Sequence, residues 1–431
     1  YGAATDLIVC RRASSLLQLL SRMFNAIWKM KEGFATGAGL ILVGLVLQYS
    51  VGPIHWSDFA FPINGIFLIL YLLTLVVVYL LRHRVRLFAF LFTAEAAVPT
   101  LIYAALLTVV MGLTRQVAPH ERAIDPIGLT QMLSFWPFVF IYARLAGIVG
   151  LIALRQILHF RLREVPSMLS HIGLFIAIVS ATLGSADMER VKLTAQTDMP
   201  EWRATHEQGF MELPLAIQLE KFTIDEYPPK LLVINSKTGK SIPAKNPDIV
   251  LIDKHFREGM LHQWRIRIQQ NLPLAAPVIT SDTTRYVAWG SSGAVTALLV
   301  EAQPMKDGKE VGKPLTGWVT CGSYLFPFQE LKLTKDLSLV MARREPERYA
   351  SRIHVYTQSQ KNIVATVEVN KPVTVDGWKI YQLSYDEAMG RWSETSTFEL
   401  VKDPWLPAVY VGIYLLLAGA ILTFIVSQKR R

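Results

Sequence analysis

The 431-residue sequence contains only two cysteines, Cys10 and Cys321, and neither belongs to a CxxC pair or a CxxCH motif. The absence of these motifs argues against thiol redox chemistry and a cysteine zinc site, and the chain is not itself a c-type cytochrome. The sequence also lacks a Walker loop, a GxSxG elbow and a carboxylate pair at helical spacing, which disfavours the ATPase and hydrolase classes.

Charged residues are scarce as well, at 18% of the chain, whereas hydrophobic residues make up 52%. Soluble domains contain about a quarter charged residues. The net charge is +10, but the lysines and arginines lie largely beside apolar segments, where they set the topology of a membrane protein. No nucleic-acid-binding module is present. We therefore expect the lipid bilayer as a partner, and no nucleic acid.

Six apolar stretches approach the roughly 20 residues that a membrane-spanning helix requires. They cover about residues 34–51, 60–81, 87–113, 132–154, 168–186 and 406–427. The strongly basic loops alternate along the chain and therefore fall on one side of the membrane. We expect a cytoplasmic segment at 1–33, a cytoplasmic basic tail at 428–431 and an extracytoplasmic domain at 187–405. Within the first segment, residues 1–22 resemble an upstream extension before Met23.

Two ionisable side chains, Glu95 and Arg144, lie inside expected spans. A charge at membrane depth is costly and is usually paired. The third and fourth spans are joined by a short loop and should pack antiparallel. We expect a contact between Glu95 and Arg144 that has a structural role and no chemistry, and we identify no catalytic residue.

From about residue 213 the hydrophobic pattern changes to period two, as in LAIQLEKFTI, KLLVI, WRIRIQ, RIHVYTQ and IVATVEV. This alternation predicts half-buried strands. Asp376-Gly377 predicts a two-residue hairpin, and further turns are expected at 306–309 and 236–239. The fold class is therefore an α-helical membrane bundle with a large all-β domain, a sandwich or open barrel, inserted before the last span. Residues 187–212 are expected to be a mixed connector.

His171 is the one histidine inside an expected span, near its cytoplasmic start. Neutral imidazole is a common haem iron ligand, and ionisable groups in membranes are functional candidates. On residue type alone, an interfacial histidine bonded to a neighbouring carbonyl is the more common explanation. If His171 ligates haem iron, a second axial ligand at that depth has to come from another chain.

Three passages resemble the ResB family of cytochrome c biogenesis proteins. They are His171–Gly184, Val375–Tyr385 and Lys402–Gly412, which are similar to the family's last span before the outside domain, a late strand pair and the start of the final span. The order of spans and domain also agrees. The family core has three spans before the domain, so 87–186 is expected to be this core and 34–81 an added transmembrane hairpin.

The resemblance implies a system II complex in the bacterial inner membrane that moves haem b outward and attaches it to the CxxCH thiols of apocytochrome c. His171 matches the family's membrane histidine and would ligate haem transiently. The family partner is a CcsA-type (ResC-type) protein with a tryptophan-rich segment, and this chain has no such segment. The resemblance is therefore to the unfused ResB half, with the covalent chemistry at the partner's site.

Two rival interpretations remain from the residues. A membrane-anchored scaffold or peptide-binding envelope-assembly protein explains the topology and charge, but not His171 or the three passages. A b-type cytochrome that shuttles electrons requires paired histidines on facing helices, and only one histidine is present in the spans.

Overall fold

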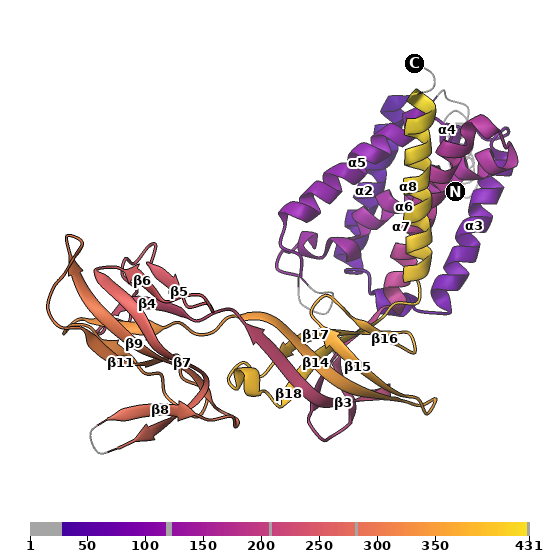
Figure 1. The fold of residues 1–431 in the computed structure, drawn as a ribbon. Helices are drawn as coiled ribbons and strands as arrows, with labels where there is room; N and C mark the ends of the chain where they lie inside the picture. Colours follow the sequence, from indigo (N-terminus) through magenta and orange to yellow (C-terminus); the bar gives the residue numbers. More distant parts are fainter. Residues whose placement is uncertain (1–27, 118–122, 207–208, 281–282, 429–431) are drawn as a thin grey trace, which may run out of the picture. The chain divides into compact units, whose positions relative to one another are not determined.

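The computed structural model describes residues 28–117, 123–206, 209–280 and 283–428 (Figure 1). The chain divides into two compact units, a helical unit formed by Tyr1–Glu189 with Lys402–Arg431 and a β unit formed by Arg190–Val401. The expected extension at 1–22 and most of the basic tail lie outside the described residues.

Six helices in the described part of the chain are long and apolar enough to cross a membrane, as the hydropathy pattern predicts. The α-helices are α2 (Met30–Ser50), α3 (Ile63–Leu81), α4 (Arg86–Phe90), α5 (Ala94–Leu113), α6 (Trp136–Leu158), α7 (Val165–Gly184) and α8 (Leu406–Gln428). Short 3₁₀ helices are η1 (Trp56–Phe59), η2 (Leu129–Ser134), η3 (Leu162–Glu164) and η4 (Ser185–Asp187).

The third span is shorter than the sequence suggests. Residues 87–113 were expected to form one continuous span, but the chain breaks after α4 and the long helix α5 begins at Ala94. Thr93 takes an extended conformation at the start of α5, and its hydroxyl donates to the carbonyl of Phe90 at 2.7 Å. A turn at 91–93 thus interrupts an apolar run that hydropathy alone treats as uniform.

The two helices of the segment expected as an added hairpin, 34–81, both contact helices that follow them in the chain. Helix α2 packs against α5 and α6, whereas α3 packs mainly against α6. A Cβ at Gly33 would meet the carbonyl oxygen of Glu95 at 2.2 Å, and one at Gly44 would meet the backbone of Pro137 at 2.6 Å. Glycine permits these close approaches because it has no side chain. Helix α2 is therefore an integral part of the bundle.

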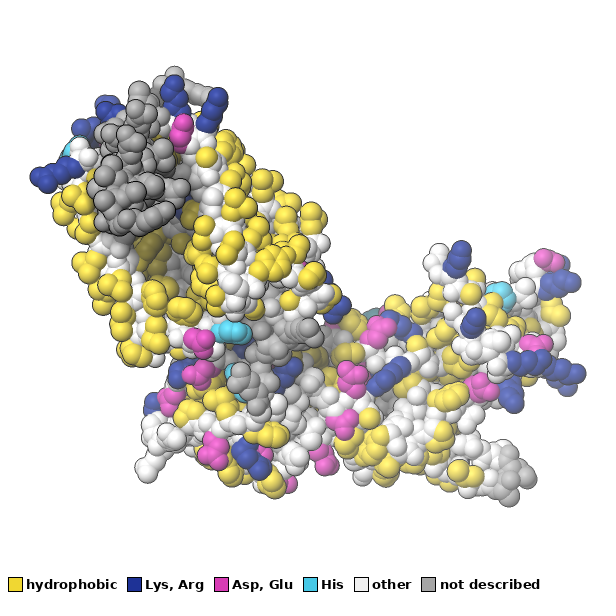
Figure 2. Space-filling view, turned by 180° about the vertical axis from the view of Figure 1, so that it is seen from behind, with side chains coloured by type: hydrophobic (Ala, Val, Ile, Leu, Met, Phe, Trp, Pro, Cys, Tyr) yellow, Lys and Arg dark blue, Asp and Glu magenta, His cyan; other side chains and the backbone are white. Residues whose placement is uncertain are grey.

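The basic loops gather at one end of the helical unit. Figure 2 shows hydrophobic side chains covering its length and Lys and Arg side chains at the end where the α3–α4 connection lies. The basic residues of these connections are Arg82, Arg84, Arg86, Arg155, Arg161 and Arg163. This distribution agrees with the alternation of charge found along the sequence.

The β unit is all-β and its sheets are antiparallel, as expected. Its strands are β1 (Glu189–Gln196), β2 (Glu201–His206), β3 (Gly209–Glu226), β4 (Lys230–Asn235), β5 (Ile249–Leu251), β6 (Glu258–Leu261), β7 (Trp264–Ile279), β8 (Thr284–Ala288), β9 (Val295–Lys306), β10 (Lys309–Glu310), β11 (Leu315–Thr320), β12 (Leu331–Lys332), β13 (Leu337–Met341), β14 (Pro346–Thr357), β15 (Asn362–Glu368), β16 (Val373–Val375), β17 (Trp378–Tyr385) and β18 (Thr395–Lys402).

One lobe of this unit is a single eight-stranded sheet in the order β15-β14-β3-β2-β1-β18-β17-β16. Its edge strands approach each other, and side chains from both halves of the sheet share one core that includes Ile217, Trp378 and Phe398. A sheet that curls until its edges meet has the character of an open barrel.

The other lobe is a sandwich. A six-stranded sheet built on β7 and β9 and a four-stranded sheet in the order β12-β13-β4-β5 enclose a second core, which includes Leu231, Ile266, Leu298 and Leu339. The sequence pattern left a sandwich and an open barrel as alternatives, and the β unit contains one lobe of each kind.

Two of the turns predicted from the sequence are two-residue hairpins in the structure. Val375 pairs with Trp378 across Asp376-Gly377, and both turn residues have positive φ, 46° and 85°. Lys306 pairs with Lys309 across a second turn of the same kind. Such two-residue hairpins require positive φ, which Asp and Gly tolerate.

The connector expected at 187–212 is mostly strand. Strands β1 and β2 belong to the eight-stranded sheet, and β1 buries Val191, Leu193 and Ala195 on alternate positions. The period-two pattern was present in ERVKLTAQ, but polar residues on the other face lowered its hydrophobicity.

Candidate functional site

His171 lies in the second turn of α7, close to the basic end of the helical unit. The helix begins at Val165 with Pro166 in its first turn, where a proline is tolerated because that N–H has no partner within the helix. The helix therefore starts abruptly after the short segment η3, and this start fixes the depth of His171 in the span.

One nitrogen of the His171 ring is firmly held. Nδ1 lies 2.8 Å from the backbone carbonyl of Ser167, 3.2 Å from its hydroxyl and 3.2 Å from Oε1 of Gln156. The amide nitrogen of Gln156, a residue only 8% exposed, donates to the Ser167 hydroxyl at 3.1 Å. A carbonyl oxygen can only accept, so Nδ1 carries the ring proton in this arrangement.

The second nitrogen is available. Nε2 of His171 has no hydrogen-bond partner among the described residues, and with the proton on Nδ1 it carries the lone pair. An axial histidine of haem iron has this pattern, with one nitrogen on the metal and the other donating to a carbonyl or carboxylate. The carbonyl bond considered for an interfacial histidine is present, but it uses only Nδ1.

The expected contact between Glu95 and Arg144 is not formed within the described part of the chain. Glu95 lies in the first turn of α5, where its neighbour Ala96 packs against Ile148 of α6. Arg144 lies one turn away from Ile148 and within electrostatic range of Tyr103, two turns further along α5. The two helices are neighbours, but their vertical offset separates the two charges.

Arg144 is instead an unusual feature of the bundle. Its Nη1 atom is buried and has no hydrogen-bond partner among the described residues. The hydroxyl of Tyr103 donates to the carbonyl of Phe34 at 3.1 Å. Arg144 thus lies near a tyrosine whose hydroxyl is already hydrogen-bonded, and no carboxylate in the described part of the chain pairs with it.

Helix α7 is held by α8 through contacts that only glycine permits. A Cβ at Gly173 would meet the backbone nitrogen of Leu416 at 2.4 Å, and a Cβ at Gly412 would meet that of Ala177 at 2.6 Å. A Cβ at Gly419 would meet the Ser170 hydroxyl at 2.4 Å. The contacts flank His171 along the helix, so α8 fixes the face of α7 on which His171 lies.

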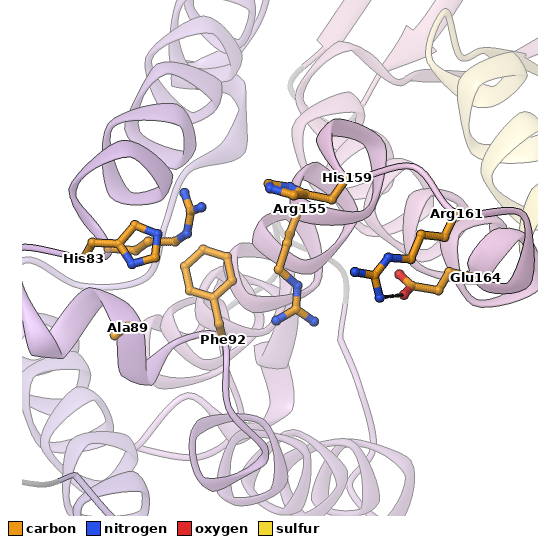
Figure 3. A pocket seen from close by; sticks show the side chains of 8 residues that line it. His83, Ala89, Phe92, Arg155, His159, Arg161 and Glu164 are labelled. Carbon is orange, nitrogen blue, oxygen red and sulfur yellow. Dashed lines mark ion pairs between the residues drawn. The ribbon is translucent and has the colours of Figure 1, made fainter.

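A cavity of about 540 Å³ lies at the ends of α3 and α6, beside α4 and η3 (Figure 3). We call it the basic pocket, and its polar and aromatic lining includes Arg82, His83, Phe92, Arg155, His159 and Arg161. The sequence places His83 and His159 in two loops between apolar stretches. They are far apart in the sequence, so no local motif could have brought them together.

The histidines of the β unit remain without a shared site. Within the described residues no group of three His, Cys, Asp or Glu side chains is placed to hold a metal ion. His354, for example, contacts Glu220 through Nε2 at 3.2 Å on neighbouring strands.

A family model described as the ResB-like family matches residues 160–395, which is more than half of the chain. The matched segment includes α7 with His171 and nearly all of the β unit. It contains two of the three passages noted in the sequence, and the third, Lys402–Gly412, lies beyond it. A search among curated proteins finds no match.

Proposed function

The chain belongs to the ResB-like family, and from this premise we propose that it is the membrane component of a system II cytochrome c maturation complex. It aids the export of haem b and the covalent attachment of that haem to the CxxCH thiols of apocytochrome c. The family model supports involvement in cytochrome c biogenesis, and the more specific role rests on His171.

The geometry of His171 is the observation that carries the proposal. Its Nδ1 atom is held by Ser167 and Gln156, and its Nε2 atom is free to bind iron. His171 would serve as an axial ligand while haem is held at the basic end of the bundle. The haem, when bound, supplies the vinyl groups that become thioethers.

A partner chain is part of the proposal because haem iron bound by two axial ligands needs a second donor. None of the other five long helices contains a histidine. A CcsA-type protein, the partner implied by the family resemblance, would supply the second ligand and carry the covalent chemistry. We therefore assign this chain no catalytic role of its own.

The β unit would lie on the extracytoplasmic side, with both chain termini in the cytoplasm and the helices in the bacterial inner membrane. The gathering of Arg and Lys at one end of the helical unit supports this orientation. In that position the β unit would hold the partner and guide the apocytochrome.

The test is an absorption spectrum of the chain purified from haem-replete membranes with the CcsA-type partner, for wild type and His171→Ala. We expect the wild-type complex to carry a haem Soret band that weakens and shifts in His171→Ala. A wild-type complex without haem, or one whose band is unchanged in the variant, would contradict the ligand role. The scaffold interpretation would then be preferred.

A further inference from the structure

Tyr79 of α3, which is only 6% exposed, contacts two of the residues that line the basic pocket. The Tyr79 hydroxyl lies 3.2 Å from Nδ1 of His159, the residue that follows α6. The guanidinium of Arg82 stacks over the Tyr79 ring at 3.8 Å and donates to the Tyr79 carbonyl at 2.6 Å. One buried side chain thus holds both an imidazole and a cation at the edge of the pocket.

The pocket has more positive charge than its own carboxylate can neutralise. Glu164 pairs with Arg161 at 3.6 Å. Arg82 contacts only neutral groups of Tyr79, and Arg155 has no ion pair among the described residues. Two guanidinium groups at the cavity therefore have no carboxylate partner among the described residues, and arginine binds carboxylates with paired hydrogen bonds.

The histidines give the pocket a second kind of donor. Figure 3 shows His83 and His159 on opposite sides of the cavity in this view, with Phe92 between them and Arg155 beside His159. Nδ1 of His159 lies 3.2 Å from the Tyr79 hydroxyl, which can donate or accept, and in the tautomer with the proton on Nδ1 the Nε2 atom carries the lone pair. At His171 a carbonyl oxygen fixes that tautomer, whereas at His159 the hydroxyl permits it.

The pocket and His171 are connected through α6. Arg155 lines the pocket and lies within electrostatic range of His171, and the adjacent Gln156 binds the His171 ring. Neighbouring residues of α6 therefore contact the pocket and the His171 ring.

We propose that the basic pocket is a docking site for haem b ahead of His171, with His159 facing the iron and Arg82 and Arg155 binding the two propionates. This inference rests on the proposed function and adds a second set of residues to it. A phospholipid headgroup would also satisfy the arginines, but phosphate has no need of an imidazole, so the histidines favour haem.

The test uses the full chain with His171→Ala, so that the membrane ligand cannot contribute, and titrates ferric haem b while the Soret band is followed. We expect saturable binding in this background. Adding His159→Ala, or Arg82→Gln with Arg155→Gln, should weaken binding about tenfold or more.

Tyr79→Phe provides the sharper comparison because it removes only the hydroxyl that holds His159 and keeps the ring under Arg82. We expect about tenfold weaker binding, in the range seen when a ligand loses its orienting partner. Tyr71→Phe is the matched control. Tyr71 lies on α3, as Tyr79 does, but outside the pocket, and its hydroxyl donates to the carbonyl of Ala143 on α6 at 2.9 Å. It should bind haem as the parent does.

Absence of saturable haem binding in the His171→Ala background overturns the inference, and so does binding that ignores the His159 and arginine changes. Retention of phosphatidylglycerol over phosphatidylcholine that depends on the arginines, with haem binding unaffected, would identify a lipid headgroup site instead. These outcomes concern the pocket alone. The proposed function fails separately, through the spectrum of the wild-type complex with its partner.

Discussion

At the scale of single residues, the proposed function depends on which nitrogen of His171 is available to iron. The ring could rotate or exchange its proton between nitrogens if nothing held it. The Ser167 carbonyl holds Nδ1 from the same helix, and Gln156 holds it from α6 at 3.2 Å. Gln156 is therefore a positioning residue that ties the orientation of the ring to the packing of α6 on α7.

Gln156→Met should retain haem in the complex but weaken its binding about tenfold, because one of the groups that orient the ligand is lost. The measurement is haem titration of the variant with the Soret band as readout. Gln382→Met is the matched control, because Gln382 in the β unit is similarly buried and also binds a serine hydroxyl. If both variants retain wild-type affinity, the positioning role of Gln156 is wrong.

At the scale of elements, α7 and α8 form the closest helix pair of the helical unit. Lipid offers no hydrophobic driving force for helix association, so stability comes from close packing of backbones at small residues. Gly173, Gly412 and Gly419 provide these approaches, and any Cβ there meets backbone or hydroxyl atoms within 2.6 Å. The pair joins the span before the β unit to the span after it.

Gly412→Ala should destabilise the helical unit by about 1–3 kcal/mol, because the new methyl group meets backbone that cannot move aside. Thermal unfolding of the purified chain in detergent measures this. Gly39→Ala is the control, since a Cβ there meets nothing within 4 Å. That change should be neutral or stabilise by up to about 1 kcal/mol. Equal midpoints for the two variants would argue against backbone packing as the source of the stability.

At the scale of the whole molecule, the two units have separate cores. The core of the eight-stranded sheet and the core of the sandwich consist only of residues between Val191 and Leu400. The two lobes of the β unit are joined by Glu226, which is bonded to Arg391 and lies 3.5 Å from Arg344. Arg344 also donates to Thr296 of the sandwich at 2.9 Å.

A fragment containing residues 190–401 should therefore fold without the helices. We expect a soluble monomer with a β-type circular dichroism spectrum and one cooperative thermal transition. Glu226→Ala in this fragment leaves two arginines without their shared carboxylate and should cost about 3–5 kcal/mol. A fragment that aggregates or unfolds without cooperativity would show that the β unit depends on the helical unit.

Local features could be predicted because their physical causes are local. A span is apolar along its own length, a strand alternates along its own length, and Asp376-Gly377 adopts positive φ within two residues. The six membrane-competent helices and the β unit were predicted for this reason. The break before α5 was missed because the turn at 91–93 lies within a run that is apolar throughout, and hydropathy does not mark it.

His171 could be singled out from the sequence because an ionisable side chain in an apolar run is costly wherever the run lies. Only the tertiary structure decided which of its nitrogens is held, since Gln156 reaches it from another helix. The same limit applies to the offset between Glu95 and Arg144 and to the meeting of His83 with His159 in the basic pocket. Each depends on the register and rotation of packed helices, which arise from contacts between segments far apart in the chain and which hydropathy does not encode.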